Sequence, residues 1–244
     1  MINKEARVDI LGVGFDNISK ADAIDYILSI MPDHNAEYIV TPNPEIVMLA
    51  RKDASLASAI EKACLVIPDG IGIMYGAKIL GKTIKERIPG IDFTSSLFER
   101  MAKEGKSVFL FGAKPGVAEK AAENISAQFP GIVISGFCDG YFSDDAPIIE
   151  KINAAKPDFL MVCLGCPKQE LWMQTNAAEL DVGVMIGAGG SLDVFSGTVE
   201  RAPMAWRKLG LEWLHRLLKD PKRIRRMAVL PKFIFAVIFS RFRG

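Results

Sequence analysis

Residues 108–128 read VFLFGAKPGVAEKAAENISAQ. The first four residues form an apolar run, which is typical of a strand that is buried on both faces of a sheet. A glycine-rich turn follows from Gly112 to Gly116, and residues 117–128 have the pattern of a helix. The same unit of strand, glycine-rich turn and helix recurs over residues 159–178 and 182–195. This repetition predicts parallel strands joined by helices.

The chain before residue 105 alternates in a similar way. Its predicted strands are 8–14, 38–40 and 65–67, and its predicted helices begin after Ser19, at Pro44 and at Ala54. We therefore expect an α/β protein with a Rossmann-like, largely parallel sheet and helices on both faces. Ligands bind such sheets at the carboxyl ends of the strands.

Composition excludes several classes of protein. The 244 residues are 50% hydrophobic and 24% charged, which excludes a disordered chain and a collagen. Four cysteines are too few for a disulfide framework, and no signal peptide opens the chain. The longest apolar candidate, residues 227–239, is interrupted by Pro231 and Lys232. We expect a cytoplasmic protein that does not span a membrane.

Charge is distributed unevenly along the chain. Residues 201–244 hold 12 Lys and Arg against 2 acidic residues, whereas the first 200 residues hold 18 against 27. We therefore divide the chain into a body, 1–200, and a C-terminal appendage, 201–244, with a possible further boundary near residue 105.

The appendage has the pattern of a basic amphipathic helix. Apolar residues recur at helical spacing from Trp206 to Leu218, with basic residues between them. This pattern favours an interfacial membrane anchor. The alternatives are packing on the body or on another subunit, so a homo-oligomer is left open. The acidic body argues against a nucleic acid partner.

Three polar residues follow two early strands of the predicted sheet. Thr41, Asn43 and Asp69 lie just past the strand ends, where a carboxylate beside hydroxyl and amide groups is suited to act as a general base. The simpler alternative, which spacing alone favours, is that Asn43 caps a helix and Asp69 builds a turn.

The three glycine-rich turns are candidates for an anion site. Backbone N–H groups at helix N-termini bind phosphate, and glycine allows close approach. None of the turns has the GxGxxG pattern, which argues against a dinucleotide-dependent dehydrogenase. Cys163 and Cys166 lack the partners of a zinc or redox site, and no metal site is expected.

Several ordered motifs resemble those of the WecG/TagA/CpsF family of bacterial glycosyltransferases. The resemblance covers nearly the whole chain, and it rests on residues 41–45 (TPNPE), 68–72 (PDGIG), 86–92 (ERIPGID), 111–116 (FGAKPG), 165–170 (GCPKQE) and 187–193 (GAGGSLD), followed by Gly197 and residues 201–203 (RAP). It implies an inverting, metal-independent transfer of an N-acetylmannosamine-type sugar from a UDP donor, without a cofactor. The implied acceptor is N-acetylglucosamine on an undecaprenyl diphosphate carrier, at the cytoplasmic face of the bacterial membrane, as in teichoic acid synthesis.

The resemblance also implies roles for individual residues. Asp69 would be the general base, with Thr41, Asn43, Arg87 and Gln169 around the reacting groups. The donor nucleotide would contact the glycine-rich turns and residues beside them, namely Gly112, Lys114, Tyr141, Gly165, Gly189, Gly190 and Asp193. The acceptor diphosphate and the membrane would contact Arg216, Arg223 and Arg226. Two other functions are weighed: a UDP-hexose transferase for capsule or exopolysaccharide, and a non-catalytic scaffold of a polysaccharide assembly complex.

Overall fold

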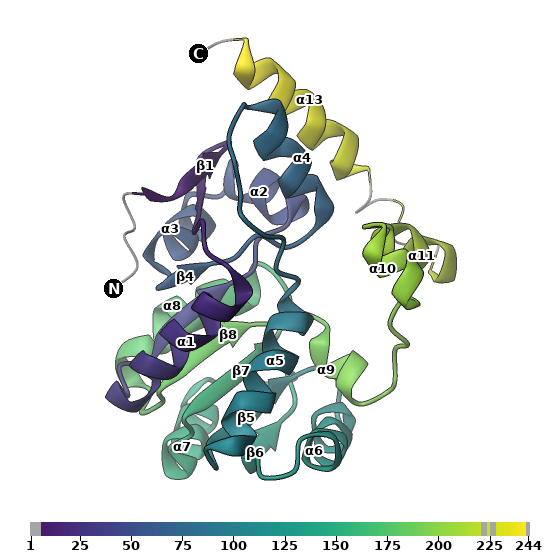
Figure 1. The fold of residues 1–244 in the computed structure, drawn as a ribbon. Helices are drawn as coiled ribbons and strands as arrows, with labels where there is room; N and C mark the ends of the chain where they lie inside the picture. The colour runs from purple at the N-terminus through teal and green to yellow at the C-terminus, as the bar shows by residue number, and fades with distance from the viewer. Residues whose placement is uncertain (1–5, 221–223, 225–227, 243–244) are drawn as a thin grey trace.

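The computed structural model describes residues 6–220, 224 and 228–242. A six-stranded parallel sheet runs through the middle of the molecule in the order β4-β3-β8-β7-β5-β6 (Figure 1). Its strands are β3 (Glu37–Val40), β4 (Leu65–Val66), β5 (Ser107–Gly112), β6 (Val133–Cys138), β7 (Phe159–Cys163) and β8 (Val184–Gly187). The predicted α/β class with a largely parallel sheet is confirmed.

Helices cover both faces of this sheet. One face packs against α1 (Lys20–Ile30), α5 (Gly90–Lys103), α6 (Val117–Gln128) and α9 (Ser191–Phe195). The other packs against α2 (Pro44–Ala50), α3 (Ala54–Lys62), α7 (Ala146–Ala155) and α8 (Lys168–Asn176). In β7 the side chains of Phe159 and Met161 enter the first core, whereas Leu160 and Val162 enter the second. This alternation explains why the strands are apolar at every position.

Three helices complete the C-terminal part of the described chain: α10 (Met204–Lys208), α11 (Glu212–Lys219) and α13 (Val229–Arg241). Helix α13 packs along α2 and α4 (Ile71–Ile79), at the end of the molecule away from α6 and α7 (Figure 1). Phe233 and Val237 of α13 are fully buried in the second core. Pro231 lies in the first turn of α13, where its missing N–H costs the helix little.

Two predicted elements are wrong in detail. The single strand over residues 8–14 is an antiparallel hairpin, β1 (Val8–Ile10) and β2 (Val13–Phe15), because Leu11 and Gly12 adopt positive φ and reverse the chain. The single amphipathic helix over residues 206–218 is two helices, because Gly210 has a φ of 71° and interrupts the helical conformation. A Cβ at Gly210 would lie 3.0 Å from Ile71, so this break also lets the chain pass close to α4.

Candidate active site

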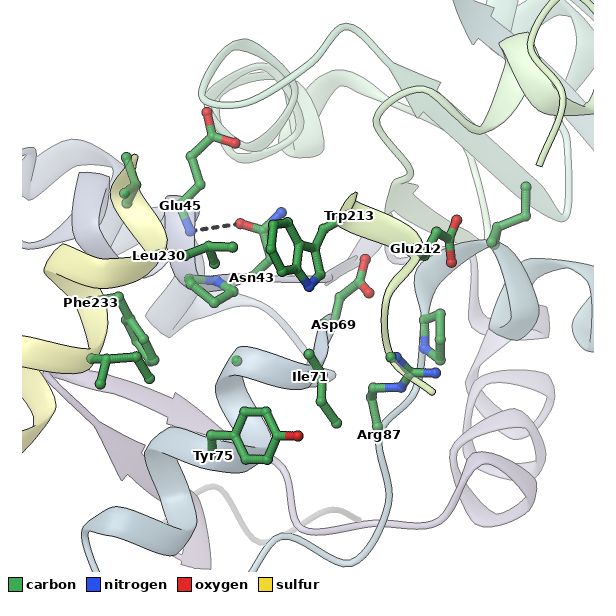
Figure 2. Close-up of a pocket in the computed structure, with 18 residues that line it drawn as sticks. Asn43, Glu45, Asp69, Ile71, Tyr75, Arg87, Glu212, Trp213, Leu230 and Phe233 are labelled. Atoms are coloured by element: carbon green, nitrogen blue, oxygen red, sulfur yellow. Dashed lines mark hydrogen bonds between the residues drawn. The ribbon is translucent and has the colours of Figure 1, made fainter. Parts of the chain in front are cut away.

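A pocket of about 340 Å³ opens beyond the carboxyl ends of β3 and β4 (Figure 2). Residues from five separate stretches of the chain line it: 43–45 at the start of α2, 69–75 from the loop after β4 into α4, 87–91 at the start of α5, 210–213 at the start of α11, and 229–234 in α13. Asn43, Asp69 and Arg87 are among the lining residues. The structure therefore brings together three of the five predicted catalytic residues.

Backbone hydrogen bonds hold these three residues next to one another. The amide of Asp69 donates to the carbonyl of Pro42 (3.2 Å), which joins the loops after β3 and β4. The amide of Ile88 donates to the carbonyl of Pro68 (3.0 Å), which places Arg87 beside the same loop. Gly70, with a φ of 86°, makes the turn that starts α4 after Asp69, in a conformation that favours glycine.

Asn43 has the capping role that the simpler interpretation gave it. Its side-chain oxygen accepts hydrogen bonds from the amides of Glu45 (2.9 Å) and Ile46 (3.1 Å) at the start of α2. The cap uses the carbonyl oxygen, so the NH₂ group is the part of the side chain suited to donate to a ligand. Figure 2 shows the ring of Trp213 from α11 drawn between the amide of Asn43 and the carboxylate of Asp69, and all three residues line the pocket.

Cationic groups gather beside Asp69. Arg87 donates from Nη2 to the carbonyl of Arg207 (3.1 Å), which joins the body to α10. Arg201 donates from Nη1 to Asp92 (2.6 Å), and its Nε lies 3.8 Å from Glu212. Within the described chain, Nε and Nη2 of Arg201 and Nε of Arg207 are buried without a hydrogen-bond partner. Neither Arg201 nor Arg207 lines the pocket, so these donors belong to the packing beside it.

The ionisation of this cluster is set by competition between burial and charge. Burial disfavours the charged form of Arg201, but the carboxylates of Asp92, Glu212 and Asp69 outweigh it and raise the pKa of the guanidinium. Burial likewise opposes ionisation of Asp92, yet the hydrogen bond and the charge of Arg201 lower the pKa of that carboxyl. Both groups are therefore charged at neutral pH.

The other two predicted catalytic residues, Thr41 and Gln169, do not line the pocket. Thr41 is buried and donates to the carbonyl of Gly187 (3.4 Å), so it joins the ends of β3 and β8. Gln169 is only 2% exposed; it donates to Glu170 (2.8 Å) and accepts from the amide of Gly189 (3.0 Å). Neither lines the pocket, and their observed contacts orient neighbouring groups.

The predicted nucleotide residues lie along the carboxyl ends of the other strands. Gly112 is the last residue of β5 and Lys114 follows it, Tyr141 follows β6, Gly165 follows β7, and Gly189, Gly190 and Asp193 follow β8. Gly112 meets the backbone of Cys163 so closely that a side chain would collide with it. Tyr141 is 70% exposed. None of these residues lines the pocket, so they mark a second region of the same sheet edge.

The described residues contain no cluster of three or more His, Cys, Asp or Glu arranged to hold a metal. None of the four cysteines forms a disulfide, and burial raises the pKa of the Cys138 and Cys163 thiols to about 12. These two thiols are therefore protonated at neutral pH.

The predicted arginines of the appendage are only partly described. Arg216 belongs to α11, but its side chain lies outside what the structure describes, as do Arg223 and Arg226 altogether. No helix among residues 6–220, 224 and 228–242 has the length and apolar character needed to cross a bilayer.

Several lining residues were not predicted from the sequence. Tyr75, Trp213 and Phe233 line the pocket but come from helices that are distant in the sequence. One signal was present: Gly72 and Gly76 are four residues apart, a spacing that places them on one face of a helix and permits close approach.

Comparison with known proteins assigns a family. Residues 8–244 match the family described as Glycosyl transferase WecG/TagA/CpsF. A protein of Bacillus spizizenii (strain W23), named N-acetylglucosaminyldiphosphoundecaprenol N-acetyl-beta-D-mannosaminyltransferase, is 38% identical over 85% of this chain and 81% of its own. A protein of Staphylococcus aureus (strain MW2) with the same name is 35% identical over 95% of this chain and 92% of its own.

Proposed function

Because this chain belongs to the WecG/TagA/CpsF family of glycosyl transferases, we propose that it transfers N-acetylmannosamine from a UDP donor to N-acetylglucosaminyl-diphospho-undecaprenol. The relatives that carry this name match most of the chain. The observation that carries the proposal is the pocket in which Asp69 lies among Asn43, Arg87 and the neighbouring Arg201. A carboxylate beside cationic groups suits transfer of a sugar from one diphosphate-bearing molecule to another.

Asp69 is the general base of the proposed reaction. An inverting transfer needs the acceptor hydroxyl to attack the sugar carbon opposite the departing UDP. The hydroxyl proton passes to the carboxylate of Asp69, the new glycosidic bond forms, and the bond to the UDP oxygen breaks. Asn43 is a donor that orients the sugar. Thr41 and Gln169 act as positioning residues outside the pocket, through their hydrogen bonds to the backbone of Gly187 and Gly189.

Arginine side chains and backbone amides stabilise the diphosphate charge. Arg87 lines the pocket and, among the described residues, donates one hydrogen bond, to a carbonyl, so its guanidinium has further donors to offer. A buried guanidinium is an effective partner for phosphate because its donors are fixed in a plane. The glycine-rich turns after β5, β7 and β8 supply amides for the UDP moiety.

We also propose that the segment 201–244 associates with the cytoplasmic face of the membrane as a peripheral element, beside the body of residues 1–200. The outer face of α13 supports this assignment, because Phe235, Phe239 and Phe242 are exposed. Aromatic side chains next to basic residues favour an anionic bilayer surface. Co-sedimentation with vesicles of anionic phospholipid should fall in Phe239→Ser if the assignment is correct.

The decisive experiment measures UDP release from UDP-N-acetylmannosamine in the presence of a lipid-diphosphate N-acetylglucosamine acceptor. The wild type should release UDP only with acceptor, and Asp69→Asn should lose at least about a hundredfold in kcat. Asp33→Asn is the matched control, since Asp33 is exposed and precedes β3, at the amino ends of the strands and away from the pocket. Turnover of Asp69→Asn equal to that of the wild type would exclude Asp69 as the base.

A further inference from the structure

The pocket beside Asp69 has two chemically different ends. The polar end holds Asn43, Glu45, Asp69, Arg87 and Glu212. The apolar end is built from side chains of α4, α11 and α13, with Trp213 nearest the polar residues: Ile71, Tyr75, Trp213, Leu230, Phe233 and Ile234. Figure 2 shows Tyr75 and Phe233 on the side of Ile71 away from Glu212, and Asp69 on the side toward Glu212. A ligand that fills both ends is charged at one end and apolar at the other.

The apolar end is built into the packing of the helices. Phe233 is fully buried, and a Cβ at Gly76 would lie 2.9 Å from the end of its ring. A Cβ at Gly72 would lie 2.6 Å from Pro44, so the same face of α4 also receives the start of α2. These two glycines let α2 and α13 approach α4 closely. The wall therefore has a defined position without the ligand.

Polar groups for a second sugar are scarce at this end. A sugar ring needs several hydrogen-bond partners, because its hydroxyl groups lose water on binding. Of the six side chains, only the Tyr75 hydroxyl and the Trp213 indole carry a polar atom. A hydrocarbon chain needs no such partner and gains free energy as its surface leaves water.

We propose that the apolar end of the pocket binds the first isoprene units of the polyprenyl carrier, next to the diphosphate. This inference rests on the proposed function, which supplies an acceptor with a diphosphate between a sugar and a prenyl chain. Its sugar then lies at Asp69, its diphosphate faces Arg87, and its chain lies along the pocket wall that α4 and α13 form together. Tyr75 is 54% exposed, so the groove opens at this residue and lets the rest of a long chain leave the protein.

The first test compares acceptors that differ only in their lipid. N-acetylglucosamine diphosphates carrying a methyl or a farnesyl group are assayed with the full chain, below their critical micelle concentrations and without vesicles. The wild type should have a kcat/KM at least about tenfold higher for the farnesyl acceptor, since burial of each CH₂ group favours binding. Tyr75→Ser and Ile234→Ser should each reduce this preference at least about threefold.

A control variant on the same helix distinguishes binding of the prenyl chain in the groove from nonspecific binding of lipid to the protein surface. Ile238 lies one turn after Ile234 on α13, is 38% exposed and does not line the pocket. Ile238→Ser should keep the wild-type ratio between the farnesyl and methyl acceptors. Loss of the ratio in Ile238→Ser to the same extent as in Ile234→Ser would overturn the proposal.

A binding measurement makes failure of the groove distinguishable from failure of the proposed function. Fluorescence of Trp213, taken as the difference from Trp213→Phe, is titrated with farnesyl diphosphate and with inorganic diphosphate. Tighter binding of farnesyl diphosphate, with the preference reduced in Tyr75→Ser, supports the groove even if no sugar is transferred. Equal affinities for the two diphosphates would overturn the proposed prenyl groove. Acceptor-dependent UDP release in the same protein would still support the proposed function. A changed oligomeric state in Tyr75→Ser with an unchanged ratio would assign this surface to a second copy of the chain and overturn the proposal.

Discussion

Replacing Glu170 by glutamine should change how the stability of this protein depends on pH. Glu170 follows Gln169 in α8 and is only 1% exposed. Its Oε1 accepts a hydrogen bond from Gln169, whereas Oε2 is buried without a hydrogen-bond partner among the described residues. Burial raises the pKa of this carboxyl, and the hydrogen bond from Gln169 offsets only part of that effect.

The sign of the effect follows from the raised pKa. A glutamate in the unfolded chain loses its proton near pH ~4.3, while Glu170 in the folded protein keeps its proton to higher pH. Between these two pKa values the folded state binds more protons than the unfolded state, so the free energy of unfolding falls as pH rises. In that range the free energy of unfolding can change by at most about 1.4 kcal/mol per pH unit for one proton. Glutamine does not ionise, so Glu170→Gln should become progressively more stable than the wild type as the pH rises from 4 to 8.

Urea unfolding of both proteins at pH 4, 6 and 8 measures this difference. Glutamine keeps the shape of the side chain and the oxygen that accepts from Gln169, so the comparison removes little besides the ionisation. The control is Glu123→Gln, because Glu123 lies exposed in the middle of α6. The free energy of unfolding of this variant should depend on pH as that of the wild type does. Parallel profiles for Glu170→Gln and the wild type would refute the reasoning.

Three further changes test other parts of the structure. Asn43→Ala should lower the free energy of unfolding by about 1 kcal/mol, because two amides of α2 lose their cap; an unchanged urea midpoint would contradict this. Asp92→Asn should cost about 1 kcal/mol at pH 7, a small value because the carboxylate that pairs with Arg201 is partly exposed. The lowered pKa of Asp92 means that this stabilisation is lost as pH falls through the folded pKa, so the difference in thermal unfolding between the two proteins should shrink as the pH is lowered below the ordinary pKa of an aspartate. Phe233→Ala should weaken the packing of α13 by about 3 kcal/mol and reduce hydrogen-exchange protection of its amides about a hundredfold, whereas equal protection would show that Phe233 does not hold the helix.

Local sequence patterns predicted much of the sheet and its helices. Asn43 and Pro44 mark the start of α2 correctly, because a side-chain cap and a proline at the first helical position act within one turn. The helix over residues 117–128 is found at the predicted residues. The break at Gly210 was missed, because the apolar spacing from Trp206 to Leu218 is helical on both sides of it and only the φ angle of one residue differs.

The direction of the Gln169 side chain depends on contacts that local sequence patterns do not predict. The sequence placed it after a glycine-rich turn, from which a side chain can point into a site or into the core. Contacts with Glu170 and with the Gly189 amide, 20 residues further along, decide between these two directions. Such contacts depend on how β7 and β8 lie in the sheet, which no local pattern encodes.

The sequence by itself determined the parallel α/β class, the helix start at Asn43, the uneven charge and the motifs that identify the family. Those features depend on the order of apolar residues, on caps and turns, and on residue identity, all of which act over short distances along the chain. Only the tertiary structure decided that Asp69, Arg87, Trp213 and Phe233 share one pocket, and that α13 is part of the core. The physical reason is that these contacts join residues 69–87 to residues 213–233, which are more than a hundred residues further along the chain. The approach of these two segments depends on the packing of α4 against α2 and α13.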